Sequence, residues 1–191
     1  MFKIFKPYML LLLTSSFAYG QDWPELGRYF ENNKKYAQSS DNENRVVFMG
    51  NSITEGWSTI LPEFFKGKSY INRGISGQTT PQMLIRFRPD VIDLNPKVVV
   101  ILAGINDIAE NTGPSTVKMI SDNIISMADL AKINGINVII SSILPAKSFP
   151  WNPGINPPPK ISAVNKIIEQ YAKENGMIYL DYYSSMVDKN N

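Results

Sequence analysis

The sequence predicts an α/β fold in which a parallel β-sheet carries helices on both faces. Short apolar runs recur along the chain at the length of β-strands, and stretches with a 3.6-residue apolar period separate them. A length of 191 residues suits one domain with a well-buried core. Strands that alternate with helices form parallel sheets with right-handed crossovers, so this order of elements predicts the fold class.

Five apolar runs are expected to form the strands of the sheet. The strongest is Lys97–Ala103, which is β-branched and uninterrupted, as expected of a strand buried on both faces. Arg45–Met49 is also almost wholly apolar. The other three candidates are Lys68–Asn72, Asn137–Ile143 and Met177–Leu180.

Four stretches are expected to be helical. They are Trp23–Gln38, Thr80–Phe87, Ser115–Asn134 and Lys160–Glu174. Gly135 and Gly176 follow the last two directly, where a glycine commonly ends a helix.

The first twenty residues, 1–20, have the layout of a secretory signal peptide. Lys3 and Lys6 precede a short apolar run, and Ala18 and Gly20 are small residues at the −3 and −1 positions of a cleavage site before Gln21. The run is shorter than the roughly 20 residues that span a bilayer. We therefore expect cleavage near Gly20/Gln21 and a secreted or periplasmic protein. A buried N-terminal helix is the alternative.

Without this segment, the remaining domain, residues 21–191, is formally neutral. The segment carries two of the 19 Lys and Arg residues and none of the 17 Asp and Glu residues, which leaves 17 of each. No basic stripe remains to follow nucleic-acid phosphates, and no polybasic anchor remains for a membrane. We therefore expect no nucleic-acid partner and no membrane span after cleavage.

The sequence contains neither cysteine nor histidine. Without cysteine there are no disulfides, no Cys-ligated metals and no lipid-modified N-terminal cysteine. Without histidine, the commonest metal ligand and the commonest general base are both missing. We expect no metal and no cofactor.

A serine follows the first predicted strand, in the segment Gly50-Asn51-Ser52. Ligand sites of such sheets lie beyond the carboxyl ends of the strands. On a tight turn, the Ser52 hydroxyl would project into this crevice, and the N-terminus of the following helix would favour developing negative charge. The alternative is that Ser52 only caps that helix.

Two further loops at this edge carry hydrogen-bond donors. Gly74 and Gly77 permit positive φ and close approach of the backbone to a ligand, and the Gly77 N–H could donate to an oxyanion. Asn106 would place an amide at the mouth of the sheet. A structural turn and an Asx-turn or helix cap are the respective alternatives. Together with Ser52, these groups are equipped to attack an ester carbonyl and hold its tetrahedral oxyanion.

These three segments resemble, in order and spacing, the first three sequence blocks of the SGNH (GDSL-like) hydrolase superfamily. They read GNSITEG, NRGISGQTT and GIND. Within the superfamily the chain is most similar to bacterial relatives of the platelet-activating-factor acetylhydrolase subunits, over roughly residues 45–181.

The resemblance implies a flavodoxin-like three-layer α/β/α sandwich with a parallel sheet of about five strands. It also implies that Ser52 is the nucleophile and, through its backbone N–H, one oxyanion donor. The Gly77 N–H and the Asn106 side chain would be the other two donors. The family usually has aspartate where this chain has Asn51, a change that should keep the turn but remove a charge beside the nucleophile.

Family members end with an Asp-x-x-His block, in which the histidine takes the serine proton. Asp181 and Asp188 are the nearest aspartates, and neither has a histidine three residues on. A lone carboxylate is poorly matched in pKa to this proton transfer. We therefore expect a C-terminally incomplete, inactive domain without its last helix, with one apolar sheet face exposed. A naturally non-catalytic relative is the alternative.

The loop Leu144–Lys160 borders the same crevice. Phe149 and Trp151 could form an apolar or sugar-stacking wall there, or belong to a surface loop pinned by its prolines.

Neutral charge and export fit a small uncharged acyl ester, such as an O-acetyl group on a carbohydrate. A non-catalytic carbohydrate-binding or scaffold protein of this fold is the competing hypothesis. A nucleotide binder is disfavoured, because residues 50–56 lack the P-loop lysine and the G-x-G-x-x-G spacing. The sequence makes no prediction of oligomeric state.

Overall fold

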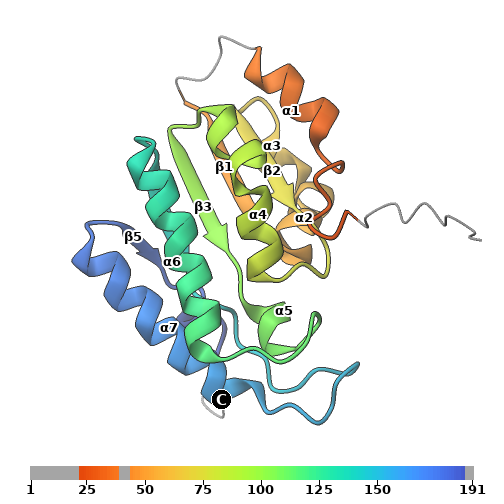
Figure 1. Cartoon of the computed structure of the whole chain (residues 1–191), viewed down its shortest axis with the longest axis vertical. Helices are drawn as coiled ribbons and strands as arrows, with labels where there is room; N and C mark the ends of the chain where they lie inside the picture. Colours follow the sequence, from red (N-terminus) through yellow and green to blue (C-terminus); the bar gives the residue numbers. More distant parts are fainter. Residues whose placement is uncertain (1–21, 39–43, 188–191) are drawn as a thin grey trace, which may run out of the picture.

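A computed structural model describes residues 22–38 and 44–187 of the chain (Figure 1). The predicted signal peptide, residues 1–20, and Asp188 lie outside the described residues.

Five parallel strands form one sheet, in the order β2-β1-β3-β4-β5. They are β1 (Val46–Gly50), β2 (Tyr70–Gly74), β3 (Val98–Leu102), β4 (Asn137–Ser141) and β5 (Ile178–Leu180). The predicted α/β fold with a parallel sheet of about five strands is confirmed. The largest differences in bounds are that β2 lies two residues later than Lys68–Asn72 and that β4 ends two residues before Ile143.

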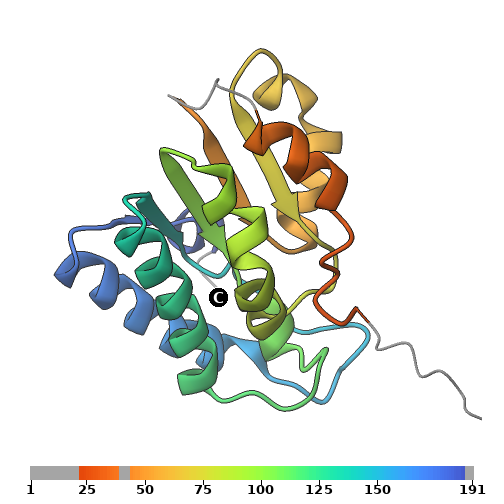
Figure 2. The ribbon, with the colours of Figure 1, turned by 45° about the horizontal axis from the view of Figure 1, so that its top comes forward.

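Helices lie on both faces of the sheet (Figure 1, Figure 2). The helices on one face are α1 (Phe30–Ala37), α4 (Thr80–Asp90), α6 (Val117–Ile133) and α7 (Pro157–Glu174). On the other face, α2 (Ser52–Ile60) and α3 (Pro62–Phe65) pack over β1 and β2. The short elements are η1 (Ile92–Leu94), α5 (Ile105–Ile108) and α8 (Tyr183–Met186).

Alternating strand residues supply two separate cores. The larger core joins strand residues such as Val47 and Ile101 to the buried faces of α4, α6 and α7. The smaller one is aromatic and centres on Phe48, which makes edge-to-face contacts with four rings at centroid distances of 5.3–5.9 Å. These rings belong to Trp57, Phe64, Phe65 and Tyr70.

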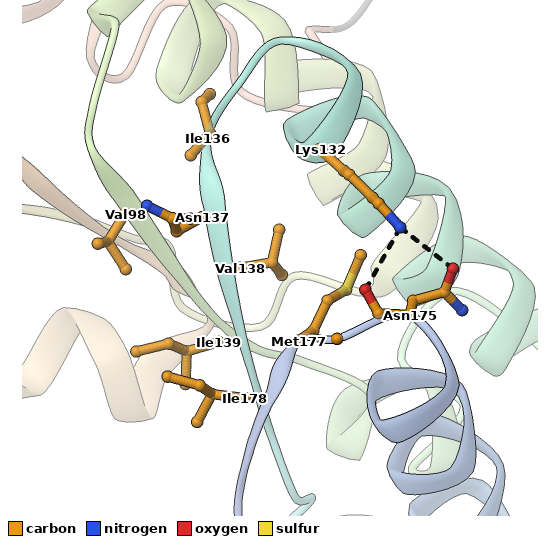
Figure 3. Close-up of a pocket in the computed structure, with 10 residues that line it drawn as sticks. Val98, Lys132, Ile136, Asn137, Val138, Ile139, Asn175, Met177 and Ile178 are labelled. Atoms are coloured by element: carbon orange, nitrogen blue, oxygen red, sulfur yellow. Dashed lines mark hydrogen bonds between the residues drawn. The ribbon is translucent and has the colours of Figure 1, made fainter.

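The face that carries α2 becomes exposed toward the last strand. Val100, Ile139 and Ile178 are paired across β3, β4 and β5 and therefore form one row on this face. Figure 3 shows Ile139 and Ile178 side by side, pointing away from Val138 and Met177. Val100 is only 8% exposed, whereas Ile178 is 60% exposed. Within the described residues, this row of apolar side chains is thus exposed at Ile178 on the edge strand.

The predicted N-terminal helix over Trp23–Gln38 is wrong in its first half, because α1 begins only at Phe30. The Asp22 carboxylate accepts hydrogen bonds from the Leu26 and Gly27 N–H groups, both at 2.8 Å, and Glu25 has a φ of 56°. These local bonds stabilise turns in place of a helix.

The other helices differ from prediction mainly at their ends. Helix α7 begins at Pro157, inside the predicted loop, because proline suits the first turn of a helix. Helix α4 continues through Pro89 to Asp90. Gly135 and Gly176 have φ values of 74° and 66°, which confirms that both end their helices in the left-handed region.

A buried arginine on α4 fixes the carboxyl ends of two strands. Arg86 is fully buried, and its guanidinium donates hydrogen bonds to the main-chain oxygens of Gly50 at 3.1 Å and Arg73 at 3.0 Å. It also donates to the Asp90 carboxylate at 2.8 Å and to the Gln78 side chain at 2.6 Å. Burial lowers the pKa of Arg86, and the Asp90 carboxylate opposes that shift. The ends of β1 and β2 are therefore held against α4 by one charged group.

Replacing Arg86 with methionine should strongly destabilise the fold. The change leaves Asp90 buried without its partner, which we expect to lower the free energy of unfolding by about 3–5 kcal/mol. Urea unfolding followed by circular dichroism measures this. Arg88→Met, an exposed position on the same helix, is the matched control and should stay within about 0.5 kcal/mol of the parent. The double change Arg86→Met with Asp90→Asn should recover part of the loss. Equal effects of the Arg86 and Arg88 changes would contradict this account.

Candidate active site

The register of the sheet brings three loops to one edge. Gly50, the last residue of β1, is paired with Gly74 of β2 and Leu102 of β3. Ser52 and Gly77 follow the first two of these strand ends by two and three residues. The segments named by the sequence analysis therefore start from neighbouring points.

Ser52 is the first residue of α2 and does not cap the helix. Asn51 is the cap: its side-chain oxygen accepts the Ile53 N–H at 3.0 Å. The Ser52 side chain is exposed, and its hydroxyl makes no hydrogen bond to another described residue. The capping interpretation of Ser52 is thus wrong, and its hydroxyl stands free at a helix N-terminus, where negative charge is favoured.

Two glycines allow α2 to start directly on the strand ends. A Cβ atom on Gly50 would lie 2.8 Å from the Leu102 carbonyl oxygen and closer still to Thr54. A Cβ atom on Gly74 would overlap the backbone of Glu55. The expected role of Gly74 was to let the backbone approach a ligand closely. In the structure, this glycine makes room for the first turn of α2.

Gly77 has the backbone conformation that its loop requires. Its φ is +77°, no described atom lies within 4 Å of a Cβ built there, and the residue is exposed. Its carbonyl oxygen accepts a hydrogen bond from the Asn111 side chain at 3.2 Å. Its own N–H has no partner among the described residues and is available as a donor.

Asn106 reaches the same loop from β3. It is 6% exposed, and its amide donates to the main-chain oxygen of Gln78, the residue after Gly77, at 2.9 Å. An amide group has two N–H donors, so one remains for a ligand. The turn before it needs Gly104, whose φ is +113° and where a Cβ would come within 2.6 Å of Ile143. Asn106 and Gly77 are therefore brought together.

Asp107 is a neighbouring residue to which the sequence analysis gave no role. Its carboxylate accepts hydrogen bonds from the Thr80 N–H at 3.0 Å and from the Thr80 hydroxyl at 2.6 Å, so it fixes the start of α4 against α5. Burial raises the pKa of Asp107 to about 6, against the opposing effect of these hydrogen bonds. The sequence signal for a role of Asp107 was its position, as a second polar residue directly after Asn106.

The two aromatic candidates occupy different environments. Phe149 is 2% exposed and packs in the large core, so it does not face the crevice. Trp151 is 65% exposed, lies 5.3 Å from Phe149 between ring centroids, and donates from Nε1 to the Asn111 side chain at 3.3 Å. Asn111 also donates to the Gly77 carbonyl oxygen, so hydrogen bonds connect Trp151 to the candidate site. Phe149 supports the Trp151 ring from the core side.

Asp181 is engaged elsewhere. Its side chain accepts the Ser184 N–H at 3.0 Å, at the start of α8, and hydrogen bonds to Ser184 lower the pKa of Asp181. This is a capping arrangement. Within residues 22–38 and 44–187, no cluster of three or more potential metal ligands occurs, and no helix is long and apolar enough to cross a membrane.

A groove of about 750 Å³ opens beside Ser52. Glu55 and Ser76 line it together with Arg28 and Tyr29 of the N-terminal segment. A second hollow, of about 410 Å³, lies at the amino ends of β4 and β5 (Figure 3). Its one charged residue, Lys132, donates to Asn175, and its lining contains neither a hydroxyl nor a carboxylate. The groove at Ser52 is therefore the candidate active site.

Comparison with known proteins identifies the family of the chain. The sequence profile of the GDSL-like lipase/acylhydrolase family matches residues 48–191. The chain belongs to this family. The match begins within β1 and includes all three loops that meet at Ser52, so the predicted resemblance is confirmed.

Individual family relatives cover different shares of the chain. The structure of a GDSL-like lipase from Bacteroides thetaiotaomicron is 52% identical, with a TM-score of 0.84, over 87% of this chain and 82% of that chain. An arylesterase of Vibrio mimicus is 30% identical over 118 residues, and an uncharacterized lipoprotein of Bacillus subtilis is 27% identical over 123 residues. These matches cover 55% and 62% of this chain, and they span only 57% and 51% of the two curated relatives.

The buried Asp107 of this family member should make its stability depend on pH. Because the folded-state pKa of about 6 lies above the ordinary 3.8, the folded protein binds the proton more tightly than the unfolded chain. Stability from this group is therefore full at low pH and falls as pH rises from about 4 to about 6, by up to about 3 kcal/mol.

Urea unfolding at several pH values measures this dependence. Asp107→Asn should flatten the decline over that range, whereas Asp93→Asn, at an exposed position, should not. The same slope in both variants would contradict the assignment.

Proposed function

We propose that this member of the family hydrolyses short-chain acyl esters through an acyl-enzyme intermediate on Ser52. The observation that carries the proposal is a free, exposed serine hydroxyl at the start of α2, on the loop that follows β1, while the loops after the two strands paired with β1 carry an unpartnered Gly77 N–H and the Asn106 amide. Its family membership supports the same reaction class.

In the proposed reaction, the Ser52 Oγ attacks the ester carbonyl carbon and its proton passes to a base. The negative charge that develops on the carbonyl oxygen is stabilised by the Ser52 N–H, the Gly77 N–H and the Asn106 amide. The first N–H groups of a helix have no intrahelical partner, which suits the Ser52 N–H to this role. Collapse of the intermediate releases the alcohol, and water then hydrolyses the acyl-serine.

This mechanism needs a base to take the Ser52 proton. Histidine is the usual base, and the 191 residues contain none. We propose that these residues alone turn over esters slowly, about 10⁴-fold below a complete triad, because loss of a triad base leaves only the oxyanion site and substrate binding. Added imidazole should then replace the missing side chain in part. A non-catalytic carbohydrate-binding protein of this fold is the competing function, and the lack of histidine is the observation that favours it.

The surroundings of Ser52 favour a small acyl group on a polar, uncharged alcohol. On one side, Ile53, Leu102 and Ile143 form apolar walls that enclose no space for a water-sized molecule, so they favour the smallest acyl group. On the other side, the groove is polar, and its Arg28 and Glu55 charges form an ion pair at 2.8 Å. An O-acetyl group on a carbohydrate fits both sides, with the exposed Trp151 as a candidate stacking surface near the rim.

We further propose that the protein works outside the cytoplasm. The signal-peptide pattern of the first twenty residues supports export, and so does the likeness to an uncharacterized lipoprotein. Cleavage between Gly20 and Gln21 is the expected processing event, and N-terminal sequencing of exported protein tests it.

Hydrolysis of p-nitrophenyl acetate, with imidazole added at increasing concentration, tests the nucleophile. Imidazole alone also hydrolyses this ester, so the rate without protein is subtracted at each concentration. We expect the remaining imidazole-dependent rate to be abolished by Ser52→Ala and lowered by about 10²–10³-fold by Asn106→Ala, the usual effect of removing one oxyanion donor. Ser126→Ala is the matched control and should keep the parent rate, because this serine lies on α6, outside the groove, and bonds only to the backbone of its own helix.

Equal imidazole-dependent rates for the parent and Ser52→Ala would exclude Ser52 as the nucleophile. Binding of an acetylated oligosaccharide without any Ser52-dependent hydrolysis would favour the non-catalytic alternative.

A further inference from the structure

Glu55 connects the helix that carries Ser52 to the loop that carries Gly77. It lies in the first turn of α2, three residues after Ser52. One carboxylate oxygen, Oε2, accepts the Ser76 N–H at 2.9 Å. The other, Oε1, accepts from the Arg28 guanidinium at 2.8 Å. Both oxygens of this carboxylate are therefore committed to fixed partners.

The bond to Ser76 restrains the backbone next to the peptide group that matters for the candidate oxyanion site. Ser76 directly precedes Gly77, so the peptide between them contains the Gly77 N–H. Glu55 holds the peptide group before this one through the Ser76 N–H, and Asn111 holds the peptide group after it through the Gly77 carbonyl at 3.2 Å. A glycine with positive φ has many accessible conformations, so such restraints decide where its N–H points.

The N-terminal segment braces the same loop from outside. The Tyr29 hydroxyl donates to the Gly74 carbonyl, and the Gln78 side chain donates to the Pro24 carbonyl at 2.8 Å. Arg28 belongs to this segment, and its side chain is 52% exposed against 29% for Glu55. An ion pair this exposed adds little to overall stability, so its effect is on the orientation of the Glu55 carboxylate.

We propose that Glu55 is a positioning residue for ester hydrolysis, which holds the backbone at the Ser76 N–H so that the Gly77 N–H, one peptide group further on, faces the oxyanion, and that Arg28 orients Glu55. The inference rests on the proposed function. Glu55 itself takes no part in bond making, because its two oxygens already accept hydrogen bonds from Ser76 and Arg28. The same contacts make the N-terminal segment, far from Gly77 in sequence, part of the active-site framework.

Two substitutions at Glu55 separate positioning from charge. Glu55→Ala removes the acceptor for Ser76, whereas Glu55→Gln keeps one carbonyl oxygen and loses the negative charge. In the imidazole-dependent hydrolysis of p-nitrophenyl acetate, Glu55→Ala should lower kcat by about 10–100-fold, short of the loss of a whole donor, and leave KM within about threefold. Glu55→Gln should recover kcat to within about threefold of the parent. Glu63→Ala, which removes an exposed carboxylate paired with Lys66 on α3, is the matched control and should keep the parent kcat.

Amide hydrogen exchange gives a readout that does not depend on turnover. Glu55→Ala should speed exchange in the peptide that contains Ser76 and Gly77, and Glu55→Gln should restore slow exchange. An unchanged kcat in Glu55→Ala would overturn the inference. So would equal losses of kcat in both variants with slow exchange retained, because charge rather than positioning would then be responsible. If the parent shows no Ser52-dependent hydrolysis, the proposed function fails first, and this inference fails with it.

Discussion

The hydrogen bonds of the Arg86 guanidinium are the interaction on which the rest of the site depends. A charged group taken from water into the interior is unfavourable unless its donors are satisfied. Here they are satisfied by the main-chain oxygens of Gly50 and Arg73, and the Asp90 carboxylate balances the charge. Because these oxygens belong to the ends of β1 and β2, the requirement to satisfy one buried cation also sets where the two loops of the site begin. The same guanidinium orients Gln78, whose main-chain oxygen accepts from Asn106.

From that fixed edge, small residues decide how closely the elements approach. Without a side chain at Gly50 and Gly74, the first turn of α2 rests on the strand ends, and Asn51 caps it. Asn51 therefore satisfies the Ile53 N–H, and the helix does not need the Ser52 hydroxyl as a cap. The local structure thus explains why a serine at this position is free for chemistry, which a capping serine would not be.

The sequence was sufficient to predict what depends on local pattern. The buried strands and amphipathic helices follow from apolar periodicity, and the convergence of Ser52, Gly77 and Asn106 follows from their places after parallel strands. What it could not predict depends on pairs far apart in the chain. Arg86 meets Gly50 across 36 positions and Arg28 meets Glu55 across 27, and no periodicity signals either contact.

The N-terminal segment and Phe149 differ from what the local sequence pattern predicts, and both differences have a physical cause. The turns that replace the start of the predicted N-terminal helix are stabilised by the Asp22 carboxylate, a competition that apolar periodicity does not record. Phe149 follows a strand end like the other site candidates, but core packing turns it inward and leaves Trp151 at the surface. Position at the correct edge of a sheet therefore predicts which loops form a site better than which way each side chain points.

The carboxylates of Glu55, Asp107 and Asp181 each have a structural role, which clarifies what these residues contribute. Glu55 accepts the Ser76 N–H, Asp107 accepts the Thr80 N–H, and Asp181 accepts the Ser184 N–H. Each is bound to a backbone donor and stabilises a loop or a helix end. Under the proposed function, the described residues thus supply the nucleophile, Ser52, and the donors that receive negative charge on the carbonyl oxygen. Acceptance of the serine proton is a separate task, for which histidine is the usual residue and of which this sequence has none. Because the two tasks rest on different groups, the geometry around Ser52 does not depend on the identity of the base. In the proposed reaction, the base that takes the proton therefore meets a serine whose helix starts on strand ends that Arg86 holds and that Gly50 and Gly74 leave open.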